Sequence, residues 1–177
     1  MTPMPACDNL RADHREMEAC LDHLLPTLQR LSPELVPQVQ AVVGRIRRLT
    51  AIHFEKEEQI FYPSLCPALR DLVAQLEQQH EQIRELEQHV AEMLSDPPQV
   101  PDSRWLNDLR MFGSQFHDFI QHHIVDEEDN LLRLAESQLT REDQERLAAE
   151  MIRLHDRRIV NFSSEQEPEL GIEGEIS

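Results

Sequence analysis

Four segments of the chain carry hydrophobic residues at alternating spacings of three and four, the pattern of helices that turn one face inward. Asp8 and Ser32 can cap the first two helices, and Pro97 with Pro98 ends the third. Short connections between long helices favour antiparallel neighbours, so the sequence predicts an all-α, up-down-up-down four-helix bundle. The four predicted helices cover, to within a few residues, 8–31, 32–61, 68–94 and 103–137.

A shorter fifth helix is expected after the bundle. Thr140 and Asp143 stand at the spacing of a capping box, with Asp in place of Glu, and predict a helix that runs to about residue 159. Beyond it the composition turns to Ser, Glu, Gly and Pro, with almost no residue able to form a core. We therefore expect one helical domain, residues 1–160, and a disordered acidic tail, residues 161–177.

Polar residues interrupt each hydrophobic seam at positions that should face the core. The first and third segments each carry one histidine there, and the second and fourth each carry a histidine followed four residues later by a glutamate. Side chains four apart on an α-helix lie on one face about 6 Å apart along the axis, so each pair can reach one centre. The interrupting residues are His14, His53, Glu57, His80, His123 and Glu127.

These residue types indicate a metal centre. Two buried carboxylates are costly unless they are protonated or bound to cations. The seams contain no lysine or arginine, and the nearest candidate, Arg84, lies one turn beyond His80 at the flank of its seam. Four imidazoles and two carboxylates are too many ligands for one tetrahedral zinc ion, but they suit two six-coordinate ions bridged by the carboxylates, with a position left for a small ligand.

The other five histidines lie away from the seams. His122 and Asp126 repeat the four-residue spacing, but they share a face with Gln115 and Asp118, so we expect that face to be solvated. The remaining histidines are expected in solvent or in structural contacts: His23, His89, His117 and His155.

Several residues beside the seams have open roles. Glu18 follows the first histidine by one turn and is either an extra ligand or an acceptor behind an imidazole. Glu58 and Glu128 directly follow the seam glutamates and are expected to be solvated or to orient an imidazole. Tyr62, near the end of its helix, either approaches the metal or covers the end of the bundle, and the second role is favoured.

Charge and cysteine content exclude several classes of partner. A formal net charge of −17 would repel nucleic acid and anionic lipid, so we expect neither as a partner. No segment resembles a signal peptide or reaches the roughly 20 apolar residues that cross a bilayer. The three cysteines form no close pair, which indicates reduced thiols and a cytoplasmic location. The oligomeric state stays open.

The motifs His-Phe-Glu-Lys-Glu-Glu from His53, Phe-Tyr-Pro from Phe61, and His-Ile-Val-Asp-Glu-Glu from His123, with single histidines between them, resemble the hemerythrin-like family, also called HHE cation-binding domains. The resemblance spans residues 8 to about 134. It implies a non-haem di-iron centre, carboxylate- and oxo-bridged, on the six residues that interrupt the seams. Oxygen-carrying members place a further histidine one turn after the third-helix ligand, where this chain has Arg84. The chain is therefore more like bacterial members linked to iron-sulfur cluster repair, nitric oxide or peroxide handling, and iron sensing.

The leading functional prediction is a protein that binds or reacts with dioxygen, peroxide or nitric oxide, in stress response or sensing. If it is an enzyme, it is a di-iron oxidoreductase. His and carboxylate ligands would also accept zinc or manganese. The alternatives are iron storage or delivery, including iron-sulfur cluster repair, and a metal-free helical interaction module. The sequence contains no nucleophile triad, phosphate-binding glycine loop or basic stripe, so hydrolases, nucleotide enzymes and nucleic-acid binders have no physical basis.

Overall fold

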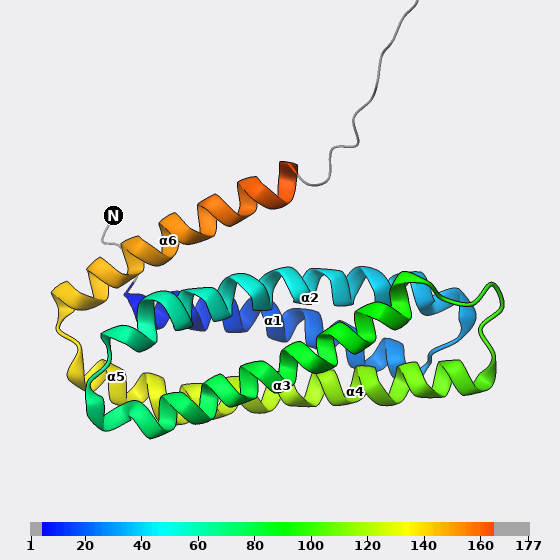
Figure 1. Cartoon of the computed structure of the whole chain (residues 1–177), viewed down its shortest axis with the longest axis horizontal. Helices are drawn as coiled ribbons and strands as arrows, with labels where there is room; N and C mark the ends of the chain where they lie inside the picture. The colour runs from blue at the N-terminus through cyan, green and yellow to red at the C-terminus, as the bar shows by residue number, and fades with distance from the viewer. Residues whose placement is uncertain (1–4, 165–177) are drawn as a thin grey trace, which may run out of the picture.

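A computed structural model describes residues 5–164, and their regular secondary structure is entirely helical (Figure 1). The fold is therefore all-α, as predicted. Each long helix contacts two others, because α1 and α3 both pack against α2 and α4. In the described part of the chain no helix is long and apolar enough to cross a membrane. The four long helices are α1 (Ala6–Gln29), α2 (Val36–Lys56), α3 (Arg70–Ser95) and α4 (Ser103–Asp126).

Short segments extend or connect these helices. The 3-10 turn η1 (Pro33–Leu35) precedes α2, and η3 (Tyr62–Ser64) and η4 (Pro67–Leu69) lead into α3. Two π-helical segments, η2 (Glu57–Phe61) and η5 (Glu127–Leu132), continue α2 and α4, and α5 (Arg133–Gln138) follows η5. The predicted second and fourth helices are thus continuous, but each contains π-helical turns that are wider than those of an α-helix.

The helix α6 (Arg141–Ser164) lies along the end of α1 and α2 in Figure 1. The predicted capping box is confirmed, because the Asp143 amide donates to Thr140 Oγ1 at 3.1 Å and the Thr140 amide donates to Asp143 Oδ2 at 3.3 Å. The helix is longer than predicted and includes residues 161–164 of the expected tail. Arg158 pairs with Glu55 on α2, which anchors the last turns. The rest of the expected disordered tail, 165–177, lies outside the described residues.

A layer of polar side chains divides the hydrophobic core into two clusters. On α1, Leu10 belongs to one cluster and Met17 to the other, and His14 lies between them. The same order holds on α3, where Leu76 and Ile83 stand on either side of the next histidine. The face of α6 completes the Leu10 cluster with Leu147, Ala148 and Met151. The polar layer is therefore shielded by apolar side chains on both sides.

The π-helical turns change which residues face the core. In an α-helix Leu134, seven residues after Glu127, would lie on the same inward face, but it is 44% exposed, whereas Leu131, Leu132 and Ala135 are buried. The prediction assumed 3.6 residues per turn throughout, and η5 adds a residue to its turn. The seam after Glu127 therefore continues with a shifted register.

Candidate metal centre

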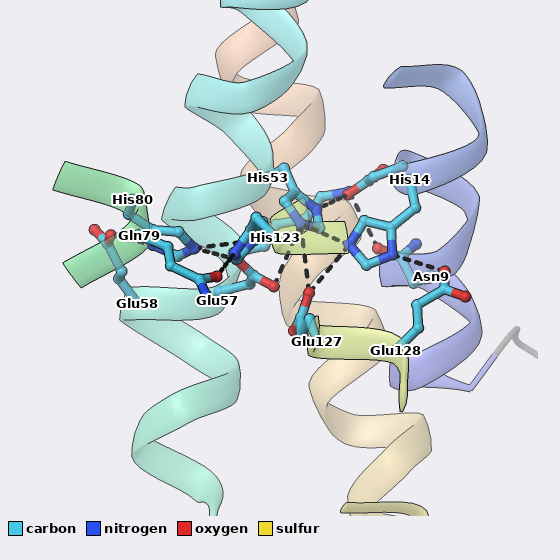
Figure 2. A network of polar contacts seen from close by, with 12 residues as sticks. Asn9, His14, His53, Glu57, Glu58, Gln79, His80, His123, Glu127 and Glu128 are labelled. Atoms are coloured by element: carbon cyan, nitrogen blue, oxygen red, sulfur yellow. Dashed lines mark hydrogen bonds and ion pairs between the residues drawn. The ribbon is translucent and has the colours of Figure 1, made fainter. Parts of the chain in front are cut away.

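All six side chains predicted to bind metal meet in the polar layer (Figure 2). Each is at most 1% exposed. The four histidines come from four different helices, and each glutamate is the first residue of a π-helical segment. The donor atoms form two groups, each within a mutual distance of 4.8 Å: His14, His53, Glu57 and Glu127, and Glu57, His80 and His123.

Each glutamate stands where its helix changes from α to π. The four-residue spacing from His53 to Glu57 spans the last α-helical turn of α2, so both side chains point to the centre. The next turn is wider, because the Tyr62 amide donates to the Glu57 carbonyl five residues earlier. Such π turns are frequently found at functional sites. An α-helical pattern places Tyr62 well away from Glu57 around the axis, whereas the wider turn brings it closer to the same face.

In one half of the centre, imidazole nitrogens and carboxylate oxygens crowd together without normal hydrogen bonds. His14 Nε2 lies 3.1 Å from His53 Nε2 and 3.0 Å from Glu127 Oε2. His53 Nε2 lies 3.3 Å from Glu57 Oε1 and 3.8 Å from Glu127 Oε2. The two nitrogens therefore point at the same small space as the two carboxylates.

The second half repeats the arrangement around a single carboxylate. His80 Nε2 lies 3.3 Å from His123 Nε2 and 3.0 Å from Glu57 Oε2, and His123 Nε2 lies 4.0 Å from the same oxygen. Glu57 thus directs one oxygen to each half. Among the described histidines, Glu127 approaches within 4.0 Å only His14 and His53. The structure consequently places Glu57, and not Glu127, between both halves.

Each of the four imidazoles also contacts a polar side chain on the side of the ring that faces away from the centre. An acceptor faces every Nδ1 atom, which lets Nδ1 carry the hydrogen and leaves Nε2 of the neutral ring as a lone pair directed inward. Glu58 and Glu128 therefore orient imidazoles, which is one of the two roles predicted for them. The Nδ1 contacts are His14–Glu128 at 2.8 Å, His53–Asp13 at 3.3 Å, His80–Glu58 at 2.7 Å and His123–Gln79 at 3.1 Å.

The surroundings of the two buried carboxylates, Glu57 and Glu127, show whether these residues fit a metal. All four side-chain oxygens of Glu57 and Glu127 are buried without a hydrogen bond, although imidazole nitrogens approach them as closely as 3.0 Å. The contacts are short but not aligned as N–H donors to these oxygens. Buried carboxylates in this condition are costly in protein interiors. Four inward nitrogens and four unpartnered oxygens form a donor set that fits metal cations.

Protons compete with metal for this donor set. Burial and the charge of Glu57 raise the pKa of Glu127 to about 7. Burial lowers the pKa of His53, but the charges of Glu57 and Asp13 outweigh it and raise the pKa to about 10. Burial and the neighbouring imidazoles hold the pKa of His123 well below its usual range. Metal binding is therefore expected to displace protons from His53 and Glu127.

Two functional neighbours were not found from the sequence, Asp13 and Lys56. Lys56 is 2% exposed, and its Nζ lies 2.6 Å from Asp13 Oδ2 and 3.1 Å from Asn9 Oδ1. Asp13 in turn faces His53 Nδ1. The hydrophobic seams contain no cation, yet the fold buries Lys56 behind His53. A signal was present, because Lys56 is the only lysine in the chain.

Tyr62 lies at the edge of the centre. Its side chain is buried, and its ring is nearly parallel to that of His80 with centroids 5.9 Å apart. Burial, with the charges of Glu57 and Glu127, raises the pKa of Tyr62 well above its usual value, so the phenol stays neutral. Its hydroxyl has no hydrogen-bond partner, which costs roughly 1–3 kcal/mol in a buried site. Tyr62 therefore covers the bundle end, as favoured, and its ring also stacks on that of His80.

The residues placed outside the site are found outside it. His122 is 72% exposed and its Nε2 lies 3.2 Å from Asp126 Oδ2, as expected for a solvated pair. Glu18, for which the sequence left open an extra ligand or an acceptor behind an imidazole, accepts a hydrogen bond from Gln121 at 3.5 Å and is not among the converging donor atoms.

We expect Gln79→Ala to weaken metal binding about 10- to 100-fold, the usual loss when the partner of a ligand imidazole is removed. The Gln79 amide is fixed at both ends, since Oε1 faces His123 and Nε2 donates to Asp126 at 2.8 Å. Competition with a chelator measures the change. Gln78→Ala, at the exposed neighbouring glutamine, is the control and should bind metal like wild type.

Helices that bury a convergent set of imidazoles and carboxylates define a helical metal-binding protein. The sequence matches the hemerythrin HHE cation binding domain over residues 6–135. The chain therefore belongs to the hemerythrin HHE family, which confirms the resemblance seen in its motifs. A comparison with curated proteins gave no significant match. Helix α6 lies beyond the matched residues.

Proposed function

We propose that this protein is an up-down-up-down four-helix bundle that holds two iron ions and binds or reacts with dioxygen, peroxide or nitric oxide. One observation carries the proposal: the four inward Nε2 atoms and the four unpartnered oxygens of Glu57 and Glu127 meet in one buried layer. The neighbour contacts of α1 to α4 support the bundle topology. Family membership supports a cation at this place.

The number of donors favours two ions over one. Two six-coordinate ions offer about twelve positions, and the protein supplies eight donor atoms, so positions are left for a bridging oxide or hydroxide and for a small ligand. The same ligands would also accept zinc or manganese. Bound iron would supply redox chemistry and the open coordination positions.

The residues of the chain provide orientation and exclusion of water. The Nδ1 acceptors hold the imidazoles in place, and the two hydrophobic clusters close the layer from both sides. The proposal includes a role in oxidative or nitrosative stress, through sensing or turnover. It also includes a cytoplasmic, reducing location, which the free thiols of Cys7, Cys20 and Cys66 support.

The alternative functions are less well supported. Iron delivery requires that a metal leaves its site readily, whereas these six side chains are at most 1% exposed. A metal-free interaction module would leave the oxygens of two buried carboxylates without partners. A metal-binding role therefore accounts for more of the structure.

The test is the iron content of the protein after anaerobic loading, together with its absorption spectrum. We expect about two irons per chain in wild type. His53→Ala should lose most of the iron, because it removes a buried imidazole whose Nε2 atom lies beside the Glu57 carboxylate. His122→Ala removes an exposed histidine with an acidic neighbour four residues away and should load like wild type. Failure of wild type to bind any metal would refute the proposed function.

A further inference from the structure

The imidazole of His80 is held by two side chains that both contact the same arginine. Its Nδ1 atom lies 2.7 Å from Oε1 of Glu58, as Figure 2 shows, and its ring stacks on Phe54 with centroids 3.9 Å apart. Arg84 donates from Nη2 to the same Glu58 oxygen at 2.7 Å. Its guanidinium also lies over the Phe54 ring, 5.3 Å from the centroid. Arg84 can therefore act on His80 through two other side chains.

The fold fixes the position of this guanidinium. Arg84 follows His80 by one turn on α3, so both side chains start from the same face of the helix. Its Nη1 atom donates to Glu81 at 3.1 Å, while Nη2 reaches across to Glu58 on η2. A planar guanidinium that contacts two carboxylates and an aromatic ring is held in one orientation. Its positive charge consequently stays next to Glu58, although the side chain is 40% exposed.

A similar contact on the other side of the centre has no such arginine. Glu128 faces His14 Nδ1 at 2.8 Å, much as Glu58 faces His80. Within residues 5–164, however, no lysine or arginine forms an ion pair with Glu128, whereas Arg84 forms one with Glu58. The arginine is therefore an addition to the His80 contact and not a requirement for placing a glutamate beside an imidazole.

A cation on Glu58 changes how strongly His80 can act as a ligand. A carboxylate that accepts the Nδ1 hydrogen raises the basicity of the ring and so strengthens Nε2 as an electron donor. Arg84 donates to the same oxygen and offsets this effect, because it neutralises the carboxylate. Net charge and hydrogen bonding around an iron site set its reduction potential. Loss of the arginine should therefore favour the ferric ion, which a stronger donor and a more negative environment both stabilise.

We propose that Arg84 is a positioning residue that raises the reduction potential of the iron centre by neutralising Glu58, the carboxylate that orients His80. This inference rests on the proposed function and adds a residue that regulates the same site. Arg84 contacts no inward nitrogen or carboxylate of the centre, so its effect passes through Glu58 and Phe54.

The test is a reductive titration of the iron-loaded full chain, followed by its absorption spectrum. Dithionite supplies the one electron that converts each ferric ion to a ferrous ion. Arg84→Gln keeps a polar side chain at a partly exposed position and removes its charge. The equilibrium should move about tenfold towards the ferric ion, the lower end of the usual effect of a group around a ligand, which is a fall of about 59 mV for one electron. An unchanged potential would overturn the inference.

Arg47→Gln is the matched control. Arg47 also joins α2 to α3, through Glu87, but that carboxylate accepts from Thr50 and not from an imidazole. Its loss should leave the reduction potential at the wild-type value. If the potential fell as far as in Arg84→Gln, the loss of any arginine on these helices would explain the result and the inference would be wrong.

The double variant Arg84→Gln with Glu58→Gln tests the route of the effect. Glu58→Gln alone should raise the reduction potential, because it removes the charge that Arg84 offsets. Adding Arg84→Gln to this variant should then lower the potential clearly less than it does in wild type. An equal fall in both backgrounds would contradict an action through Glu58. If wild type binds no iron, the proposed function itself fails, whereas bound iron with an unchanged potential in Arg84→Gln defeats this inference alone.

Discussion

Replacing Glu127 by glutamine is expected to stabilise the metal-free protein and to lower its metal affinity. The affinity should fall by more than about 100-fold, which exceeds the usual loss when a residue that hydrogen-bonds a ligand imidazole is removed. The affinity falls because Gln is a neutral and weaker ligand beside His14 and His53. The stability rises because Glu127 is fully buried and neither of its oxygens makes a hydrogen bond. Function therefore maintains a charge that folding alone disfavours.

The gain in stability should depend on pH. The pKa of Glu127 is raised from 4.5 in the unfolded chain to about 7 in the folded one. A raised pKa means that the folded state binds the extra proton between these values, so stability is full below about pH 4.5 and falls as the pH rises through about 7. At higher pH the ionised group costs on the order of 3 kcal/mol, which Glu127→Gln should recover.

Urea denaturation in the presence of a chelator measures this effect. The free energy of unfolding of Glu127→Gln should exceed that of wild type clearly at about pH 8 and little at about pH 5. Glu77→Gln replaces an exposed glutamate on α3 and should change neither value. A variant less stable than wild type at both pH values would show that Glu127 is not strained in the metal-free protein.

The sequence predicted which six polar side chains are buried together, because helical periodicity is a local property. His14 and His80 interrupt a pattern of spacings that extends on both sides of them, so their inward orientation follows from the pattern alone. The pair His123 and Glu127 spans one α-helical turn in the structure, as its spacing indicates. The burial of all six residues follows from these local relations.

The features that were missed depend on departures from the α-helix or on contacts between helices. The π turns shift the register after Glu57 and Glu127, and no hydrophobic spacing indicates where a turn widens. Gln79 and Asp13 face imidazoles on neighbouring helices, so their roles depend on how those helices are rotated against each other. Glu58 was easier to anticipate, because it directly follows Glu57, which the sequence predicts to face the core.

Replacing Lys56 by methionine is expected to destabilise the metal-free protein by about 3 kcal/mol, the lower end of the cost of leaving one partner of a buried ion pair alone. Methionine keeps most of the apolar stem, so the loss comes from the charge. Asp13 would retain a negative charge with 20% of its side chain exposed and only His53 beside it. Arg141→Met, in an ion pair on the surface, should leave the stability almost unchanged.

The double variant Lys56→Met with Asp13→Asn separates the charge from the packing. Asparagine keeps an oxygen that can accept from His53 Nδ1 but carries no charge that needs a lysine. If the ion pair accounts for the loss, the free energy of unfolding of the double variant, measured in urea, should lie within about 1 kcal/mol of the wild-type value. Replacing both partners removes the uncompensated charge. If the double variant is as unstable as Lys56→Met alone, the lysine acts through its hydrogen bond to Asn9 and its packing. The recovery in the double variant would establish that the only lysine of the chain is buried to neutralise the carboxylate that orients His53.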